Sequence, residues 1–248
     1  NRFGEAGSTV VIEEFMEGEE ASLLAFVDGK TVVPMIASQD HKRIFDGDKG
    51  PNTGGMGTYA PAPVLTDALR DEAMKTILEP MVAAMEKEGM PYVGCLYAGL
   101  MITPQGPKVV EFNARFGDPE TQVVLPLLDS DLGQVMMACA TGTLTADMVK
   151  WKDSSAACVI LASKGYPETS SKGDVIHGDI KQHDTTIVFH SGTKLVGDEY
   201  VTNGGRVLGV VGLGKDLRTA LDRAYGRIEH IDFEGMQYRT DIGAKAFK

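Results

Sequence analysis

Residues 109–120 read V-V-E-F-N-A-R-F-G-D-P-E, and this stretch carries the clearest pattern in the chain. Successive side chains of a β-strand point to opposite faces of the sheet, so the alternation in the stretch predicts a strand. Glu111, Asn113 and Arg115 then share one face of this strand. The opposite face is apolar and consists of Val110, Phe112, Ala114 and Phe116.

The polar face of this predicted strand suits a divalent cation. Glu111 and Asn113 offer two oxygen ligands one residue apart, and Mg²⁺ prefers oxygen ligands in octahedral geometry. Arg115 could hold a phosphoryl group that the same metal polarises. Spacing alone leaves one alternative open, an ordinary half-solvated strand with Glu111 and Arg115 as a surface ion pair.

The elements around this strand predict an α+β fold, because strands and helices follow each other in separate runs. The predicted strands cover residues 9–15, 21–27, 31–36, 92–103 and 108–115. An amphipathic helix is expected over residues 66–88, with Thr66 at its start, Gly89 at its end and a kink near Thr76 caused by Pro80. Shorter helices are expected over residues 120–128 and 131–141.

A domain boundary is expected near residues 150–155, which separates residues 1–150 from a small β-rich domain of residues 151–248. Beyond the boundary the apolar and β-branched runs become short. Strands are predicted there over residues 156–162, 174–177, 186–190 and 206–213. An amphipathic helix over residues 216–231 follows them.

A polar segment over residues 38–63 shows no periodicity and is therefore predicted to be a long loop. It holds Asp40, Lys42 and Arg43, and then a glycine-rich run with Asn52, Gly54, Gly55 and Gly57. Closely spaced glycines let the backbone approach an anion and direct several N–H groups toward it. A mobile surface loop is the alternative.

An acidic turn over residues 13–20 is a third candidate site. The backbone of a strand end can bind adenine, and a carboxylate one turn later can bind ribose hydroxyls. A solvated acidic turn is the alternative. The candidate residues are Glu13, Glu14, Phe15, Met16 and Glu20.

These motifs together resemble the phosphoribosylamine–glycine ligase family, which consists of ATP-grasp enzymes of purine biosynthesis. The resemblance spans nearly the whole chain. It is carried by I-E-E-F-M-E-G-E-E at 12–20, Q-D-H-K-R at 39–43, G-P-N-T-G-G-M-G at 50–57 and E-F-N-A-R-F-G-D-P-E at 111–120. G-D-V-I-H at 173–177 and N-G-G-R-V-L at 203–208 extend it.

The resemblance implies an ADP-forming C–N ligase that converts glycine to glycyl phosphate with ATP. The amine of 5-phosphoribosylamine then attacks this intermediate, giving glycinamide ribonucleotide. By this resemblance Glu111 and Asn113 hold Mg²⁺ or Mn²⁺, and Arg115 stabilises the transferred phosphoryl group. Adenine is read by Glu13, Glu14, Phe15 and Met16, and ribose by Glu20. Lys42, Arg43 and Asn52 lie near the nucleotide. Asp40 and the loop over residues 53–57, with Gly54, Gly55 and Gly57, help position glycine and the second substrate.

The resemblance covers only part of the family's length. The family's N-terminal substrate domain and first ATP-grasp subdomain have no counterpart among these residues. We therefore expect the C-terminal part of a longer protein, which in some organisms is fused to other purine-pathway enzymes. Another ATP-grasp carboxylate–amine ligase and a non-catalytic docking module remain open.

The amino-acid composition argues against two classes of binding partner, nucleic acids and membranes. The net charge is −11, which opposes nucleic-acid binding through the overall field. Three widely spaced cysteines, Cys95, Cys139 and Cys158, favour a reducing compartment, and we expect a cytoplasmic protein. No apolar run reaches the length of a membrane span, so no membrane partner is expected.

Overall fold

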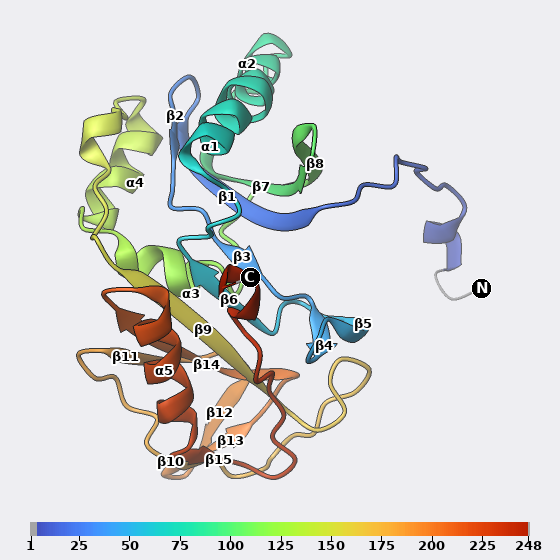
Figure 1. Ribbon diagram of the computed structural model, residues 1–248, viewed down its shortest axis with the longest axis vertical. Helices are drawn as coiled ribbons and strands as arrows, with labels where there is room; N and C mark the ends of the chain where they lie inside the picture. Colours follow the sequence, from blue (N-terminus) through green and yellow to red (C-terminus); the bar gives the residue numbers. More distant parts are fainter. Residues whose placement is uncertain (1–3, 248) are drawn as a thin grey trace.

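The computed structural model describes residues 4–247, and Figure 1 shows how the elements are arranged. The fold is α+β, as predicted. A four-stranded antiparallel sheet has the order β2-β1-β7-β8. Its strands are β1 (Glu19–Asp28), β2 (Val32–Pro34), β7 (Val93–Thr103) and β8 (Gly106–Asn113). The strands predicted over residues 21–27 and 92–103 are confirmed, and the one predicted over 108–115 is confirmed up to Asn113.

A helical arm covers one face of this sheet (Figure 1). It consists of α1 (Asp67–Ala73), a π-helical turn η2 (Met74–Leu78) and α2 (Glu79–Lys87). Thr66 caps α1 by accepting a hydrogen bond from the Leu69 amide. The π-helical turn includes Thr76, where a kink was predicted, and ends two residues before Pro80, which lacks an N–H group. Leu78 and Val82 of these helices pack in one cluster with Leu23, Leu96 and Leu100 of the sheet.

A second core lies on the other face of this sheet. The predicted helices appear there as α3 (Thr121–Val124) with the 3₁₀ turn η3 (Leu125–Leu127), and as α4 (Leu132–Thr141). Their residues Val123 and Val135 are buried with Phe26 of the first sheet and Ile160 of a second sheet. This shared core holds the two sheets together.

The second sheet has five strands in the order β11-β14-β9-β6-β3. The helix α5 (Leu217–Ile228) packs on it through Ala220 and Ala224, and Asp216 caps its start. A Cβ on Gly212 would lie 2.0 Å from the Ala220 carbonyl oxygen, so this glycine permits the close approach of helix and strand. The strands are β3 (Gln39–Asp40), β6 (Gly57–Ala60), β9 (Ser155–Ala162), β11 (Thr186–His190) and β14 (Arg206–Gly214).

The predicted long loop over residues 38–63 is wrong. It contains β3, β6 and a projecting hairpin of β4 (Arg43–Phe45) and β5 (Lys49–Asn52). Residues 57–60 are fully buried because they pair with β9, about 100 residues later in the chain. The five-stranded sheet therefore combines strands from both sides of the boundary predicted near residue 150, and that boundary stays a prediction.

The predicted strand over residues 9–15 is also wrong. These residues form an extended, exposed arm with no strand assignment (Figure 1). A strand requires a hydrogen-bonded neighbour, and none of the described residues pairs with this segment.

In the β-rich tail the sequence analysis missed one hairpin and predicted one strand that is longer than the observed one. The hairpin consists of β12 (Thr193–Val196) and β13 (Glu199–Thr202), and the strand predicted over 174–177 is reduced to β10 (His177–Gly178), paired with β15 (Ile231–Asp232). Short 3₁₀ turns complete the fold: η1 (Gly4–Gly7), η4 (Ala146–Met148) and η5 (Ala244–Phe247). No helix within residues 4–247 is long and apolar enough to cross a bilayer.

Candidate nucleotide and metal site

The three polar residues predicted on β8 line one cavity of about 220 Å³, here called the central cavity. The Asn113 side-chain amide donates a hydrogen bond of 3.2 Å to Oε1 of Glu111. The structure thus brings Glu111, Asn113 and Arg115 together, and their roles stay predictions. The full lining is Asp40, Lys42, Thr53, Gly54, Tyr97, Glu111, Asn113, Arg115, Asp118 and Glu120.

The predicted apolar face of this strand is only partly correct. The pairing of β7 with β8 shifts register between Gly99 and Leu100, so strict alternation fails near Val110. Val110 faces a small recess beside Asp40 and Lys42, and Ala114 is exposed. The other two predicted members separate: Phe112 packs in the core under the helical arm, and Phe116 packs with Phe26 in the core between the sheets.

Two carboxyl groups stand close together at the floor of the central cavity. Burial and the neighbouring Glu120 carboxylate raise the pKa of Asp40 well above its ordinary value. Glu120 is only 3% exposed and accepts hydrogen bonds from the hydroxyls of Ser22 at 3.0 Å and Tyr97 at 2.9 Å. The sequence analysis assigned no role to Glu120 or Tyr97, although Glu120 ends the quoted motif. A cation bound here would relieve the repulsion between the two carboxylates.

The structure beneath Asp40 holds its carboxylate in place. The His41 amide donates a 2.7 Å hydrogen bond to Oδ1 of Asp40, and the His41 ring lies 3.1 Å from the Gly57 carbonyl oxygen. Burial, helped by the positive charges of Arg239 and Lys245, lowers the pKa of His41 to about 4. The imidazole is therefore neutral at physiological pH.

A second hollow of about 260 Å³, here called the hairpin cavity, lies between β1 and the β4–β5 hairpin. It brings together Glu20, Lys42, Arg43 and Asn52, all predicted near the nucleotide. Nζ of Lys42 lies 3.2 Å from the Glu20 carboxylate. Burial opposes the charge on Lys42, but the Glu20 carboxylate outweighs it and raises the pKa of Lys42 above its ordinary value. The sequence analysis missed Asp48 and Lys245, which also line this cavity.

The acidic turn lies along a larger hollow of about 820 Å³, here called the arm cavity. Glu14, Phe15 and Met16 line it, and Glu14 makes a 2.7 Å ion pair with Lys108. Glu13 is exposed and is not among its lining residues. Residues 13–16 form no strand, so the expected strand is wrong. Their role in reading adenine through the backbone stays a prediction.

The glycine-rich run does not form the predicted cradle of free N–H groups. The Gly54 amide donates to the Tyr166 hydroxyl at 3.0 Å, and the Gly55 amide donates to the Thr53 hydroxyl at 3.0 Å. The glycines instead provide space. A Cβ on Gly55, whose φ is +109°, would lie 2.4 Å from Cδ of Pro119 and 2.7 Å from Oδ1 of Asp40. A Cβ on Gly57 would likewise lie 2.7 Å from the Cys158 carbonyl oxygen.

These cavities form a row, because neighbours share lining residues. Gly18 and Glu19 line both the arm cavity and the hairpin cavity. Asp40 and Lys42 line both the hairpin cavity and the central cavity. The row therefore runs from the extended arm past β1 to the end of β8, and an elongated ligand such as a nucleotide can follow it.

The central cavity fits a hard divalent cation. A carboxylate and an amide oxygen on one strand suit Mg²⁺ or Mn²⁺, and Mg²⁺ commonly takes one or two protein ligands and completes its shell with water and phosphate oxygens. The described residues contain no group of three or more His, Cys, Asp or Glu side chains placed to hold a metal. Glu111 and Asn113 are the residues here that could hold such a cation, and this role stays a prediction. Gly99 leaves room for Glu111, since a Cβ there would lie 3.2 Å from Cγ of Glu111.

Two family models match this chain. Phosphoribosylglycinamide synthetase, ATP-grasp (A) domain, matches residues 1–121, and Phosphoribosylglycinamide synthetase, C domain, matches residues 156–245. The interval between the two matches contains the boundary predicted near residue 150.

Curated relatives agree with these models. A phosphoribosylamine–glycine ligase of Caulobacter vibrioides is 55% identical over 250 residues, which cover 100% of this chain and 58% of that protein. One of Synechocystis sp. is 52% identical over 98% of this chain and 59% of that protein. A trifunctional purine biosynthetic protein adenosine-3 of Gallus gallus is 53% identical over 98% of this chain and 24% of that protein. The chain thus spans somewhat less than two thirds of the single-function relatives.

Solved structures agree on the fold. The crystal structure of phosphoribosylamine–glycine ligase from Thermotoga maritima superposes with a TM-score of 0.82 at 36% identity, covering 93% of this chain and 57% of that one. The biotin carboxylase domain of 2-oxoglutarate carboxylase from Hydrogenobacter thermophilus superposes with a TM-score of 0.66 at 14% identity, covering 91% of this chain and 48% of that one. The second likeness concerns the ATP-grasp fold alone.

Proposed function

This chain belongs to the phosphoribosylglycinamide synthetase family, and we propose that it supplies part of the active site of an ATP-dependent ligase. The reaction joins glycine to 5-phosphoribosylamine and releases ADP and phosphate. One observation carries the proposal: Glu111, Asn113 and Arg115 line the same cavity as Asp40, at one end of a row of hollows that share lining residues.

In the first step a carboxylate oxygen of glycine attacks the γ-phosphorus of ATP, and ADP leaves with the electrons of the broken P–O bond. Little covalent help is needed from the protein, so positioning and charge neutralisation dominate. Arg115 stabilises the negative charge on the transferred phosphoryl group. Glu111 and Asn113 would hold a divalent cation, which would supply neutralisation of the phosphate charge.

Asp40 positions glycine in this step. The ammonium group of glycine is a cation, and a positive charge beside Asp40 would offset the repulsion from Glu120. Bound there, it places the glycine carboxylate inside the central cavity, which Arg115 also lines.

In the second step the amine nitrogen of phosphoribosylamine attacks the carbonyl carbon of glycyl phosphate. The bond from that carbon to the phosphate oxygen breaks, phosphate leaves with the electron pair, and the nitrogen loses a proton. An amide bond results. Phosphorylation in the first step is what makes the carboxyl carbon electrophilic enough for this attack.

The nucleotide occupies the rest of the row. Lys42, Arg43 and Asn52 face its phosphates and sugar, and Glu20 accepts hydrogen bonds from ribose hydroxyls. Adenine lies in the arm cavity, against Phe15 and Met16. Glu13 contributes through the backbone of the arm, and Gly54, Gly55 and Gly57 contribute by letting the loop pack beside Asp40.

Glu111→Ala tests the proposal in a protein that contains this chain within the family's full length. Glycine-dependent ADP formation should fall by at least about 1000-fold, about 4 kcal/mol of transition-state stabilisation, because a metal ligand is lost. Titration with Mn²⁺, followed by electron paramagnetic resonance, should show weakened binding. Glu199→Ala, at an exposed position of β13, is the matched control and should change neither measurement. Normal turnover in Glu111→Ala contradicts the metal assignment.

Substrate identity has its own test. Phosphate release is measured with glycine, alanine and serine as the acid, and with phosphoribosylamine and ammonia as the amine. Phosphate release that does not depend on glycine points to another ATP-grasp carboxylate–amine ligase, and no release with any pair points to a non-catalytic module.

We also propose a cytoplasmic location and, in some organisms, fusion to other purine-pathway enzymes. Cys95, Cys139 and Cys158 are all free and buried, which agrees with a reducing compartment. The relatives include proteins named as trifunctional and bifunctional purine biosynthetic proteins.

A further inference from the structure

The segment over residues 239–245 holds the β4–β5 hairpin, which forms one wall of the hairpin cavity. It contacts the turn of this hairpin, residues 46–48, from the far end of the sequence. The hydrogen bonds include those from the Thr240 amide to Asp46 at 2.9 Å, from the Gly47 amide to Asp241 at 2.8 Å and from Arg239 to Asp48 at 2.9 Å. The position of the hairpin therefore depends on this segment.

The segment is itself fixed by packing on α5. Ile242 is 3% exposed and lies in one cluster with Leu221 of α5. Gly243 has a φ of +86°, and a Cβ there would lie 2.5 Å from Cδ1 of Leu221, so a side chain at this position would push the segment away from the helix. The turn η5 that follows thus starts from a defined place, and Lys245 is its second residue.

Lys245 lines the hairpin cavity together with Lys42 and Arg43. Its Nζ lies 2.6 Å from Oδ2 of Asp48. An ammonium group carries three N–H donors, and the interactions found among residues 4–247 use one of them. Two donors are thus left for a ligand in the cavity.

Asp48 keeps a partner when Lys245 turns toward such a ligand. Nη1 of Arg239 donates to the other carboxylate oxygen of Asp48, Oδ1, at 2.9 Å. The Lys245 side chain is 31% exposed and carries its ammonium on a flexible stem. The ammonium can therefore move to a ligand without leaving an unpaired carboxylate behind.

The charges around the hairpin cavity make each free cation important for an anionic ligand. Nζ of Lys42 lies 3.2 Å from the Glu20 carboxylate, and Nη1 of Arg43 donates to the Gly50 carbonyl oxygen at 2.6 Å. The lining sets three cations, Lys42, Arg43 and Lys245, against four carboxylates, Glu19, Glu20, Asp40 and Asp48. A polyphosphate therefore gains from every ammonium group that still has free donors.

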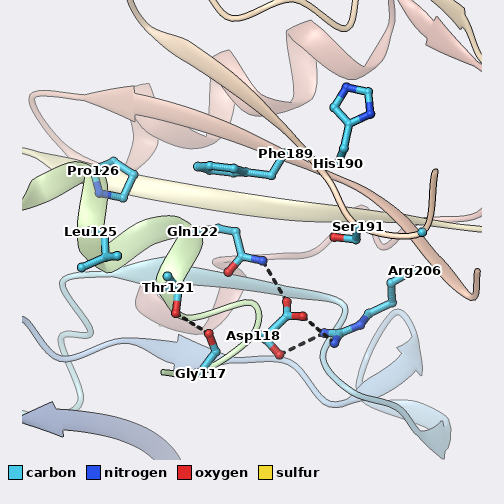
Figure 2. A pocket seen from close by; sticks show the side chains of 11 residues that line it. Gly117, Asp118, Thr121, Gln122, Leu125, Pro126, Phe189, His190, Ser191 and Arg206 are labelled. Carbon is cyan, nitrogen blue, oxygen red and sulfur yellow. Dashed lines mark hydrogen bonds and ion pairs between the residues drawn. The ribbon is translucent and has the colours of Figure 1, made fainter. Parts of the chain in front are cut away.

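Arg206 of β14 is a contrasting case. It also reaches the row of cavities from the second half of the chain, because Nη1 donates at 2.6 Å to the carbonyl oxygen of Gly54, which lines the central cavity. Figure 2 shows its guanidinium against Asp118, and Nη2 lies 2.9 Å from Oδ2 of that residue. Both terminal nitrogens of Arg206 thus bind protein acceptors, whereas Lys245 keeps donors free.

We propose that Lys245 binds the phosphates of the nucleotide, and that residues 239–245 are part of the nucleotide site. The proposal rests on the function proposed above, in which the hairpin cavity takes the phosphates and the sugar. The hairpin lies within the match to the ATP-grasp domain, residues 1–121, and Lys245 lies within the match to the C domain, residues 156–245. The C domain then supplies a phosphate ligand of its own.

Lys245→Met tests this in a protein that contains the chain within the family's full length. The Kd of ADP with Mg²⁺, measured by isothermal titration calorimetry, should rise roughly 10-fold, because a charge-assisted contact to a phosphate is lost. The Kd of adenosine, which has no phosphate, should change less than about 2-fold, and Lys245→Arg should keep the Kd of ADP within about 3-fold. Lys194→Met is the matched control, because Lys194 is exposed on β12 and lies outside the lining of the hairpin cavity. It should change neither Kd.

Asp48→Asn distinguishes a phosphate ligand from a residue that only supports the hairpin. This variant breaks the ion pair but keeps the Lys245 ammonium. ADP should bind at least as tightly as it does to the unmodified protein, because one carboxylate is removed from the cavity. If Lys245→Met and Asp48→Asn weaken ADP binding by the same factor, Lys245 acts only through Asp48 and the proposal is overturned.

This inference and the proposed function fail in different ways, because ADP binding needs no glycine. If the unmodified protein shows no glycine-dependent ADP formation, the proposed function fails, and the Kd of ADP still decides the role of Lys245. An unchanged Kd of ADP in Lys245→Met overturns the inference while the proposed function stands. An equal rise in the Kd of ADP and of adenosine also overturns it, because Lys245 would then support the whole site rather than bind the phosphates.

Discussion

The central cavity and the arm cavity are held by different kinds of structure. The central cavity is framed by paired strands, and its floor residue Glu120 is 3% exposed. One wall of the arm cavity is an unpaired segment in which Phe15 is 86% exposed. The residues proposed for phosphate and metal chemistry thus lie on backbone that the fold fixes, whereas the predicted adenine contacts lie on a segment with few packing partners.

The hairpin cavity is intermediate between these two extremes. The β4–β5 hairpin projects from the sheet, but the buried Arg239 side chain holds it in place through hydrogen bonds. Arg239 is 1% exposed and donates to the Arg43 carbonyl oxygen at 3.1 Å and to Asp48 at 2.9 Å. It also pairs with Asp241 at 2.7 Å.

The largest stability effect should come from Arg239→Met. Removing the buried guanidinium leaves Asp48 and Asp241 without their main partner, so the free energy of unfolding should fall by about 3 kcal/mol in urea titration. Arg70→Met is the control, because Arg70 pairs with Asp67 and Asp71 on the exposed surface of α1 and should contribute under about 1 kcal/mol. An equal loss of unfolding free energy in the two variants would show that Arg239 does not stabilise the hairpin.

A pH effect of similar size should come from His41. Its pKa is about 4 in the folded protein, below its ordinary value, so between about pH 6.5 and pH 4 the unfolded chain binds the extra proton. The free energy of unfolding should therefore fall as pH is lowered through this window, by roughly 3 kcal/mol in total. Urea titrations at half-unit pH steps measure the slope, and His41→Gln should flatten it. A slope that survives in His41→Gln assigns the effect to other groups.

A smaller and opposite effect is expected from Asp40→Asn. The pKa of Asp40 is raised, so its ionised form costs stability at high pH, and this cost disappears as pH falls through the folded-state pKa. At pH 8 the variant should be more stable by about 1 kcal/mol, with less gain at pH 5, and it should lose glycine-dependent activity. Asp198→Asn, in an exposed turn, is the control and should show neither change. A destabilised Asp40→Asn would mean that Asp40 is not strained by Glu120.

The smallest stability effect should come from Phe15→Ala in the arm. Because the ring is exposed, the free energy of unfolding should change by less than about 0.5 kcal/mol. The KM for ATP in the full-length protein should nevertheless rise several-fold if adenine packs on this ring. Val11→Ala, exposed on the same arm but outside the arm cavity, should alter neither quantity. If the free energy of unfolding fell by more than about 1 kcal/mol, the arm would be packed as firmly as the central cavity, and the contrast between them would not hold.

The sequence was most informative where chemistry and local structure coincide. Glu111, Asn113 and Arg115 could be placed together because β8 carries the first two at its period of two residues and Arg115 follows two residues after its end. The same reasoning failed at Val110, where a register shift that depends on the neighbouring strand interrupts the alternation. It also failed at residues 9–15, whose β-branched composition satisfies the pattern but whose backbone finds no partner among the described residues.

What the amino-acid sequence determined by itself is the α+β class, the polar face of β8, the capped helices and the family. All of these follow from spacing within about ten residues or from motifs that stand as continuous strings. Only the tertiary structure decided that residues 57–60 enter the five-stranded sheet, that Glu120 stands beside Asp40, and that Arg206 joins Asp118 and Gly54 across 88 and 152 residues. The physical reason is that burial and charge pairing depend on which distant segments meet, and no local period encodes that meeting.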